Sequence, residues 1–129
     1  MLGAQELVAF VAVTDAARAR AFYENILGLT LIADTPFAIV FDANGTTLRV
    51  SLVDHLEPAG YTVLGWQVDD IAASVRELAA RGVSFNRYDG MGQDELGVWT
   101  APDGDQVAWF PDPDGNTLSL TQAAGQARS

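Results

Sequence analysis

The chain repeats one plan of secondary structure twice, and this repeat limits the possible folds more than any other feature. Residues 6–31 predict a strand, a helix, a glycine stop and a second strand, and residues 61–85 predict the same series. Two matched pairs fall at an offset of 55 residues: Val13 with Val68, and Asp15 with Asp70. The sequence therefore predicts two modules of similar structure in one chain.

Each predicted helix has local signals for its start and its end. Thr14 or Asp15 can cap the first helix, and Asp69 or Asp70 the second, because their side-chain oxygens accept the free backbone N–H groups of a first helical turn. The glycines that can close the helices in the left-handed conformation are Gly28 and Gly82. Both helices are expected to lie on a sheet.

Short apolar segments separated by turn residues follow each helix and predict strands. These segments are 37–43 and 46–53 in the first half, and 83–88, 97–101, 106–110 and 116–122 in the second. The fold class is therefore α+β, with two tandem βαβββ modules in a single domain. The expected boundaries are 5–54 for module one, 55–60 for a linker, 61–122 for module two and 123–129 for a tail.

Composition excludes several partners and chemistries. The formal charge of the 129 residues is −10, and all seven basic residues are arginines that form no run, so neither nucleic acid nor an anionic membrane is expected as a partner. No apolar segment approaches the ~20 residues of a membrane span. The chain has no cysteine, which removes thiolate nucleophiles and ligands, and a cytoplasmic protein is the simplest expectation.

The acidic segment Asp112-Pro113-Asp114-Gly115-Asn116 predicts a turn rather than an ion site. Asp112 can accept hydrogen bonds from the turn, Pro113 presets φ, and Gly115 supplies a positive φ. The remaining ligands of a twelve-residue calcium loop are absent from the sequence that follows.

Three segments carry a family resemblance: "VTDAARARAFYENILGL" at 13–29, "VDDIAASVRELAARGV" at 68–83 and "DPDGNTLSL" at 112–120. In this order, within a doubled plan, they resemble the vicinal oxygen chelate (VOC) superfamily, which includes glyoxalase I, extradiol dioxygenases, fosfomycin-modifying enzymes and bleomycin-resistance proteins. The resemblance covers residues 6–122. It implies that each module curls its strands into half of a barrel-like mixed sheet around a pocket, with the helices outside, and that the protein is a homodimer.

The resemblance also shows which residues would hold a metal ion. The family's metalloenzymes take ligands from the first and last strand of each module, and the matching positions here are Val8, Val63, Ser119 and either Ser51 or Arg49. None of these is a normal ligand for a divalent metal, which needs imidazole or carboxylate groups. No metal and no cofactor is therefore expected. The only histidine, His55, lies in the predicted linker and is expected to be exposed.

Strand alternation predicts which side chains face the pocket, because residues two apart share a face. If Val8 and Ser51 point inward, Phe10 and Arg49 do so too, and Gln67 joins the face of Val63. The residues predicted to bind a ligand are Phe10, Phe37, Arg49, Ser51, Gln67, Tyr88, Trp99 and Ser119.

Three features of this predicted pocket stay open. An inward Arg49 would pair either with an acidic residue of the protein or with an anionic or carbonyl group of a ligand. Tyr88 and Trp99 flank residues 86–97, which could form a lid or a simple surface loop. Alternation does not decide whether Trp109 or Phe110 faces the pocket.

These residues favour a metal-independent small-molecule-binding protein that sequesters a drug or an aromatic metabolite, as the bleomycin-resistance branch does. The alternative is a VOC enzyme, a glyoxalase-like lyase or isomerase or a dioxygenase-like protein, with a non-standard or absent metal site. No pair of nucleophile and base is visible, so no catalytic residue is assigned. A regulatory or interaction protein without a ligand is the third reading.

Overall fold

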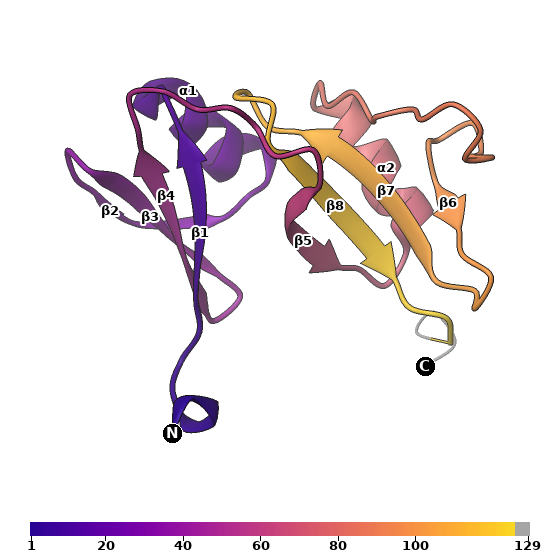
Figure 1. Ribbon diagram of the computed structural model, residues 1–129, viewed down its shortest axis with the longest axis horizontal. Helices are drawn as coiled ribbons and strands as arrows, with labels where there is room; N and C mark the ends of the chain where they lie inside the picture. Colours follow the sequence, from indigo (N-terminus) through magenta and orange to yellow (C-terminus); the bar gives the residue numbers. More distant parts are fainter. Residues whose placement is uncertain (126–129) are drawn as a thin grey trace. The chain divides into compact units, whose positions relative to one another are not determined.

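A computed structural model describes residues 1–125 and shows two compact units, Met1–Glu57 and the chain from Pro58 onward. Each unit contains one βαβββ module, so the doubled plan is confirmed (Figure 1). Of the predicted tail, residues 126–129 lie outside the described residues. No helix within residues 1–125 is long and apolar enough to cross a membrane.

The first unit is a four-stranded mixed sheet with the order β1-β4-β3-β2. Strands β1 and β4 run parallel, while β3 runs antiparallel to both of its neighbours. After the short helix η1 (Leu2–Ala4), its elements are β1 (Val8–Val13), α1 (Ala16–Arg20), the π-helix η2 (Ala21–Ile26), β2 (Thr30–Asp34), β3 (Ala38–Ala43) and β4 (Thr46–Leu52).

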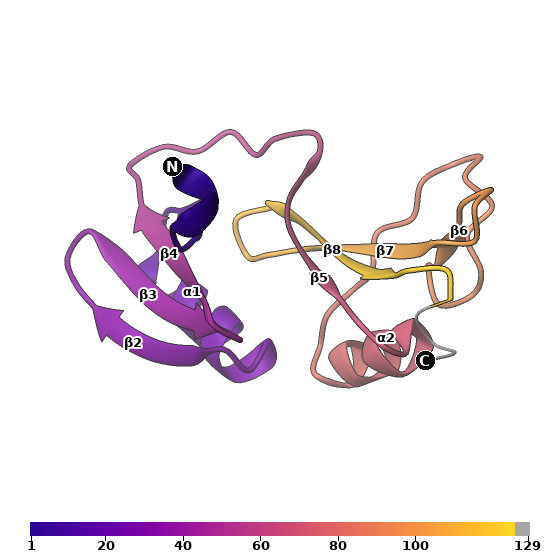
Figure 2. The ribbon, with the colours of Figure 1, turned by 90° about the horizontal axis from the view of Figure 1, so that it is seen from below.

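The second unit has the same topology, with the strand order β5-β8-β7-β6 and a parallel pair formed by β5 and β8. Figure 2 shows helix α2 on one face of this sheet. The elements are β5 (Thr62–Gln67), α2 (Ile71–Ala80), β6 (Trp99–Thr100), β7 (Gln106–Pro111) and β8 (Thr117–Gln122).

Both helices begin at the second of the two candidate caps. The Asp15 carboxylate accepts from the backbone N–H of Arg18 at 3.0 Å, and the Asp70 carboxylate accepts from that of Ala73 at 3.1 Å. The glycines that follow the helices have left-handed φ angles of 76° at Gly28 and 98° at Gly82. The predicted signals therefore decide where the helical segments start and end.

Each sheet buries the face that packs on its own helices. In the first unit this core contains Tyr23 of η2 and Phe41 of β3, both fully buried, with ring centroids 6.2 Å apart. In the second unit α2 contacts β7 and β8, and Phe110 is fully buried with its ring 5.4 Å from that of Phe85. The opposite face of each sheet carries the predicted ligand-binding strand residues.

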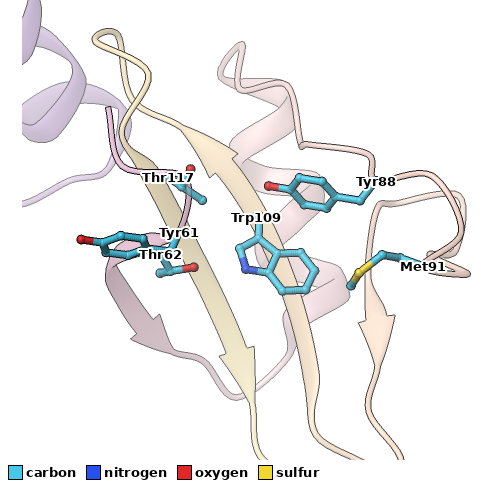
Figure 3. A pocket seen from close by; sticks show the side chains of 7 residues that line it. Tyr61, Thr62, Tyr88, Met91, Trp109 and Thr117 are labelled. Carbon is cyan, nitrogen blue, oxygen red and sulfur yellow. The ribbon is translucent and has the colours of Figure 1, made fainter. Parts of the chain in front are cut away.

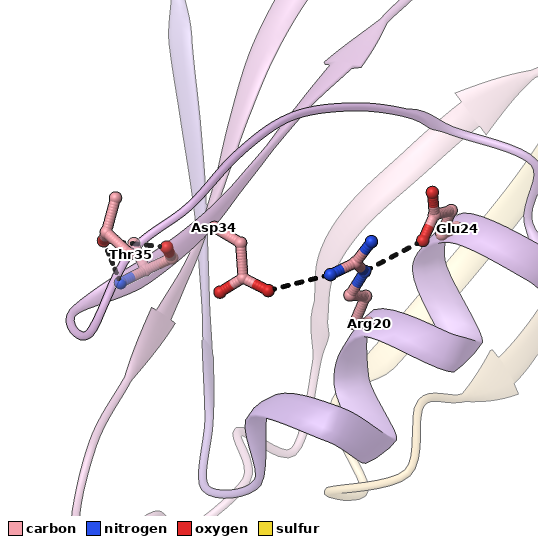
Figure 4. A network of polar contacts seen from close by, with 5 residues as sticks. Arg20, Glu24, Asp34 and Thr35 are labelled. Carbon is pink, nitrogen blue, oxygen red and sulfur yellow. Dashed lines mark hydrogen bonds and ion pairs between the residues drawn. The ribbon is translucent and has the colours of Figure 1, made fainter.

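A polar network on the surface joins the first helix to its sheet (Figure 4). The Arg20 guanidinium donates to the Glu24 carboxylate and to the Asp34 carboxylate, each at 3.0 Å. The hydrogen bond that Arg20 donates to Glu24, followed by the charge of Glu24 and by Asp34, raises the pKa of Arg20 above its ordinary value. Since these side chains are 33–44% exposed to solvent, their ion pairs contribute little to the stability of the fold.

The prediction of a strand at 83–88 was wrong, because this segment forms a loop. In the part of the chain that the structure describes, one backbone hydrogen bond joins it to the sheet, from the N–H of Asn86 to the carbonyl of Trp109 at 2.7 Å. The Gln93 side chain satisfies backbone groups that a neighbouring strand would otherwise pair. Its amide donates to the Asn86 carbonyl at 2.9 Å and accepts from the Tyr88 N–H at 2.7 Å.

Candidate ligand-binding site

The register of β5, β8 and β7 determines which aromatic residue of β7 lies on the face away from α2. Trp109 pairs with Ser119, which pairs with Gly65, so these three residues form one row across the sheet. Phe110 pairs with Leu118, and both are fully buried on the helix side. Because adjacent residues of a strand point to opposite faces, Trp109 belongs to the face away from α2, which we call the open face.

A hollow with a volume of about 250 Å³ lies beside Trp109. We call it the aromatic pocket, and it is lined by Gly60, Tyr61, Thr62, Tyr88, Met91, Trp109 and Thr117. Figure 3 shows Trp109 between Tyr61 and Tyr88, with the Met91 side chain directed toward the indole. All of these residues belong to the second unit. The pocket is therefore formed by the loop 86–97 and by the start of β5 together with β7 and β8.

The rings around the pocket meet at defined angles. Tyr88 and Trp109 lie 5.6 Å apart with planes at 82°, so that they form a corner. Trp99 of β6 lies 6.1 Å from Trp109 with planes at 35°. Trp99 thus supports the indole from the neighbouring strand and does not line the pocket. A ligand in this space would contact ring faces and a thioether, which provide apolar area for affinity.

The loop 86–97 holds Tyr88 in place through its own hydrogen bonds. The Gln93 amide also donates to the Gly97 carbonyl at 2.8 Å, and the Arg87 guanidinium donates to the backbone carbonyls of Asp94 and Glu95. The Asn86 side chain donates to the Tyr88 hydroxyl at 3.2 Å. These contacts make the segment a compact braced loop, and a lid motion stays a prediction.

A bulge in β5 changes which residues of this strand face the pocket. Thr62 pairs with Thr117 while Leu64 pairs with Leu118, so Val63 is an extra residue in the strand. Strict alternation placed Val63 on the face of Gly65, but the bulge brings Thr62 into the row of Thr117, and Thr62 lines the pocket. Alternation therefore does not carry through Val63, since a bulge shifts it by one residue, and the direction of the Val63 side chain stays a prediction.

In the first unit, the predicted residues also share one sheet face. Phe10 pairs with Arg49 and Arg49 with Val40, while Ser51 lies two residues further along β4. Phe10 is 61% exposed and Arg49 is half-buried. No acidic residue within the described chain forms an ion pair with Arg49, so the salt bridge considered from the sequence is not present there. A half-buried guanidinium can remain hydrated at its tip.

Phe37 lies in the turn between β2 and β3, where its backbone carbonyl accepts from the N–H of Leu52 of β4 at 2.9 Å. The Thr35 hydroxyl donates to the Ala38 carbonyl at 3.0 Å and accepts from the Ala38 N–H at 3.1 Å, which closes the turn. The Phe37 side chain is 79% exposed. A role for Phe37 in binding stays a prediction that the turn geometry does not favour.

Comparison with known proteins identifies the family. The sequence profile of the Glyoxalase/Bleomycin resistance protein/Dioxygenase superfamily matches residues 6–120. The chain belongs to this superfamily. No curated protein matches the chain in sequence. A superfamily member from Sphaerobacter thermophilus is 28% identical, with a TM-score of 0.73 over 93% of this chain and 98% of the other.

Two more distant structures of the superfamily share the fold. A lactoylglutathione lyase from Agrobacterium tumefaciens is 16% identical, with a TM-score of 0.71 over 93% of this chain and 94% of the other. The fosfomycin resistance protein FosX from Listeria monocytogenes is 17% identical, with a TM-score of 0.73 over 95% of this chain and 96% of the other. At these identities the likeness is one of fold alone.

The residues at the superfamily's metal positions do not fit a divalent metal ion. Val8 and Val63 have no donor atom, and Ser119 is a neutral hydroxyl whose oxygen points toward Gly65. Among residues 1–125, no three histidine, aspartate or glutamate side chains come together in a group that could hold a metal. His55 is an exposed linker residue, as expected, with 83% of its side chain accessible.

The structure gathers half of the predicted site residues around one sheet face of the second unit. Tyr88 lines the aromatic pocket, Trp99 and Ser119 adjoin Trp109, and the exposed Gln67 lies at the end of β5. The other four, Phe10, Phe37, Arg49 and Ser51, belong to the first unit. Sequence reasoning missed several lining residues, namely Gly60, Tyr61, Thr62 and Met91, and left open whether Trp109 or Phe110 faces the pocket. The structure decides between these two residues, because Phe110 is buried on the helix side and the two alternate along β7.

Close packing of β5 on β8 gives a first testable prediction. A Cβ atom at Gly65 would lie 2.5 Å from the Ser119 hydroxyl oxygen, below any normal contact distance. We expect Gly65→Ala to lower the free energy of unfolding by about 1–2 kcal/mol. Ser119→Ala in the same chain should restore most of this loss, because the next atom of Ser119 is 3.4 Å away. Urea denaturation of both single variants and the double variant measures the coupling. Additive losses would contradict the contact.

Proposed function

We propose that this protein binds a small organic molecule in the aromatic pocket without the help of a metal ion. The arrangement of Tyr88, Met91 and Trp109 around a hollow of about 250 Å³ carries this proposal. Ligand sites are usually concave and mostly apolar, with a few polar groups that fix orientation, and the hydroxyls of Thr62 and Thr117 supply such groups here. The ligand is a drug or metabolite with an aromatic or amphipathic part.

Sequestration of the ligand explains the site better than turnover does. The superfamily contains enzymes, but the metal positions of this chain hold Val8, Val63 and Ser119, which can neither bind nor activate a substrate through a metal. Among the described residues, the lining of the pocket includes no carboxylate, imidazole, amine or thiol to act as an acid, a base or a nucleophile. A homodimer, which the family resemblance implies, and a cytoplasmic location are part of the same proposal.

Tryptophan fluorescence gives a direct test of binding. We expect titration with a panel of planar aromatic antibiotics and metabolites to yield at least one compound that quenches the emission saturably. Trp109→Ala should lower the affinity for that compound by about 30-fold, because a central aromatic residue contributes about 2 kcal/mol or more to a binding site. Calorimetry measures this affinity. A chelator should leave the affinity unchanged.

Trp66 provides the matched control for this experiment. It pairs with Leu120 on the helix side of the same sheet, so Trp66→Phe should keep the affinity of the selected compound. Equal losses in the two variants would mean that Trp109 acts through the fold. Near-stoichiometric metal in the purified protein, removed by the chelator together with binding, would overturn the metal-independent reading.

A further inference from the structure

We propose that the aromatic pocket selects a ligand with a methylated ammonium group, which sits in the corner between Tyr88 and Trp109. This inference rests on the proposed function and adds the charge and the shape of the group that the pocket recognises. It follows from the angle between the rings, from the residues that line the pocket and from the charge of the chain.

The ring geometry favours a compact group over a flat one. Tyr88 and Trp109 meet at 82°, so a planar ligand can stack on only one of them. A trimethylammonium group is nearly spherical, and it can contact both rings at once. Tyr61 is a third ring that lines the same pocket, and Figure 3 shows it on the side of Trp109 away from Tyr88. Aromatic rings that surround a point attract a cation because their faces carry partial negative charge.

The charges around the pocket favour a cation over an anion. Among residues 1–125, the lining of the pocket includes no basic side chain. The nearest arginine in sequence to Tyr88 is Arg87, and its guanidinium is occupied by the carbonyls of Asp94 and Glu95. The net charge of −10 makes the approach of a cation favourable and that of an anion unfavourable.

Within the described residues no acidic side chain lines the pocket, and this determines which kind of cation fits. A primary ammonium carries three N–H donors that need acceptors, and the polar side chains here are two threonine and two tyrosine hydroxyls. A fully methylated ammonium has no N–H donor, so it loses little when ring faces replace water around it. The Met91 thioether adds a polarisable apolar contact of the same kind.

Two probes of the same shape test the inference: choline and its uncharged carbon isostere 3,3-dimethylbutan-1-ol. The protein contains only two methionines, Met91 in the pocket and the fully exposed Met1. Labelling both with ¹³C-methyl therefore gives a pocket signal and an internal control. In 0.15 M salt we expect the Met91 signal to titrate with both probes, and choline to bind about five- to tenfold more tightly. The Met1 signal should not titrate.

Three variants separate ring contacts from the general acidity of the chain. Trp109→Leu keeps the net charge, so the preference for choline should fall to near parity if the rings cause it. Because Tyr61 is 71% exposed, we expect substitutions there to leave the fold intact. Tyr61→Phe should then keep the preference for choline, and Tyr61→Leu should reduce it about twofold.

Equal affinities of the two probes for the native protein would overturn the ammonium inference and leave the proposed function standing, provided that a neutral aromatic compound binds. A preference that survives Trp109→Leu would overturn it as well. Failure of every compound to shift Met91 would overturn both proposals.

Discussion

Phe110→Ala is expected to lower the free energy of unfolding by about 3–5 kcal/mol, the typical cost of removing a buried phenylalanine ring. Phe110 is fully buried and contacts Phe85 in the core of the second unit, so the substitution removes apolar contacts and leaves a cavity. The neighbouring change Trp109→Ala should cost only about 1–2 kcal/mol, because the larger indole is half-buried on the open face. Urea denaturation of both variants measures the difference.

This pair of adjacent residues also distinguishes folding from binding. We expect Trp109→Ala to abolish most ligand affinity in a protein that still unfolds cooperatively, while Phe110→Ala keeps the pocket-lining residues and loses stability. Phe110→Leu is the conservative control, and it should recover about half of the loss since it refills part of the cavity. If Trp109→Ala proved the more destabilising of the two, the assignment of faces along β7 would be wrong.

The sequence was sufficient to predict the fold, because the signals that determine it are local. Asp15 and Asp70 lie directly before helical segments and Gly28 and Gly82 directly after them, so each helix is bounded by its own neighbours in the chain. The doubling of this pattern added a long-range constraint that single motifs do not provide. The family match over residues 6–120 agrees with this prediction.

The site was harder to predict because its residues depend on contacts between distant segments. Alternation along β5 fails at Val63, where a bulge opposite β8 inserts one residue that no sequence pattern marked. Gln93 holds the loop that carries Tyr88 and Met91, and its role depends on carbonyls that only the folded chain brings together. Tyr88 was chosen from the sequence because it borders the segment that interrupts the repeat, and it lines the aromatic pocket, while its contact with a ligand stays a prediction.

Arg49 shows how the structure narrows an alternative that the sequence leaves open. An inward arginine was expected to meet an acid of the protein or a group of the ligand. Its strand neighbours are Phe10 and Val40, and no ion pair is formed within residues 1–125. Contact with an anionic group of a ligand therefore stays a prediction for this face of the first unit.

Asp112→Ala is expected to lower the free energy of unfolding by about 3 kcal/mol, a large effect for a turn residue. Asp112 is 4% exposed, and its carboxylate accepts from the backbone N–H groups of Asp114 and Asn116, each at 2.9 Å, and from the Asn116 side-chain amide at 2.8 Å. Alanine would leave these donors without their acceptor in a site that is nearly closed to water. The turn predicted from Asp112-Pro113-Asp114-Gly115-Asn116 is thus confirmed, with Gly115 at a φ of 87°.

The first module contains a natural control for this prediction. Asp42 occupies the equivalent turn, but its carboxylate accepts only the Gly45 N–H at 3.1 Å among the described contacts, in an exposed setting. Asp42→Ala should therefore cost only about 0.5–1 kcal/mol. Urea denaturation of both variants, with Asp112→Asn as an isosteric third, measures the contrast. Asp112→Asn should fall between them, because it keeps one acceptor oxygen for the backbone but places an amide against the Asn116 amide. Similar losses at Asp42 and Asp112 would show that burial of the Asp112 network contributes nothing, and a gain in stability from Asp112→Ala would point to a strained acidic cluster.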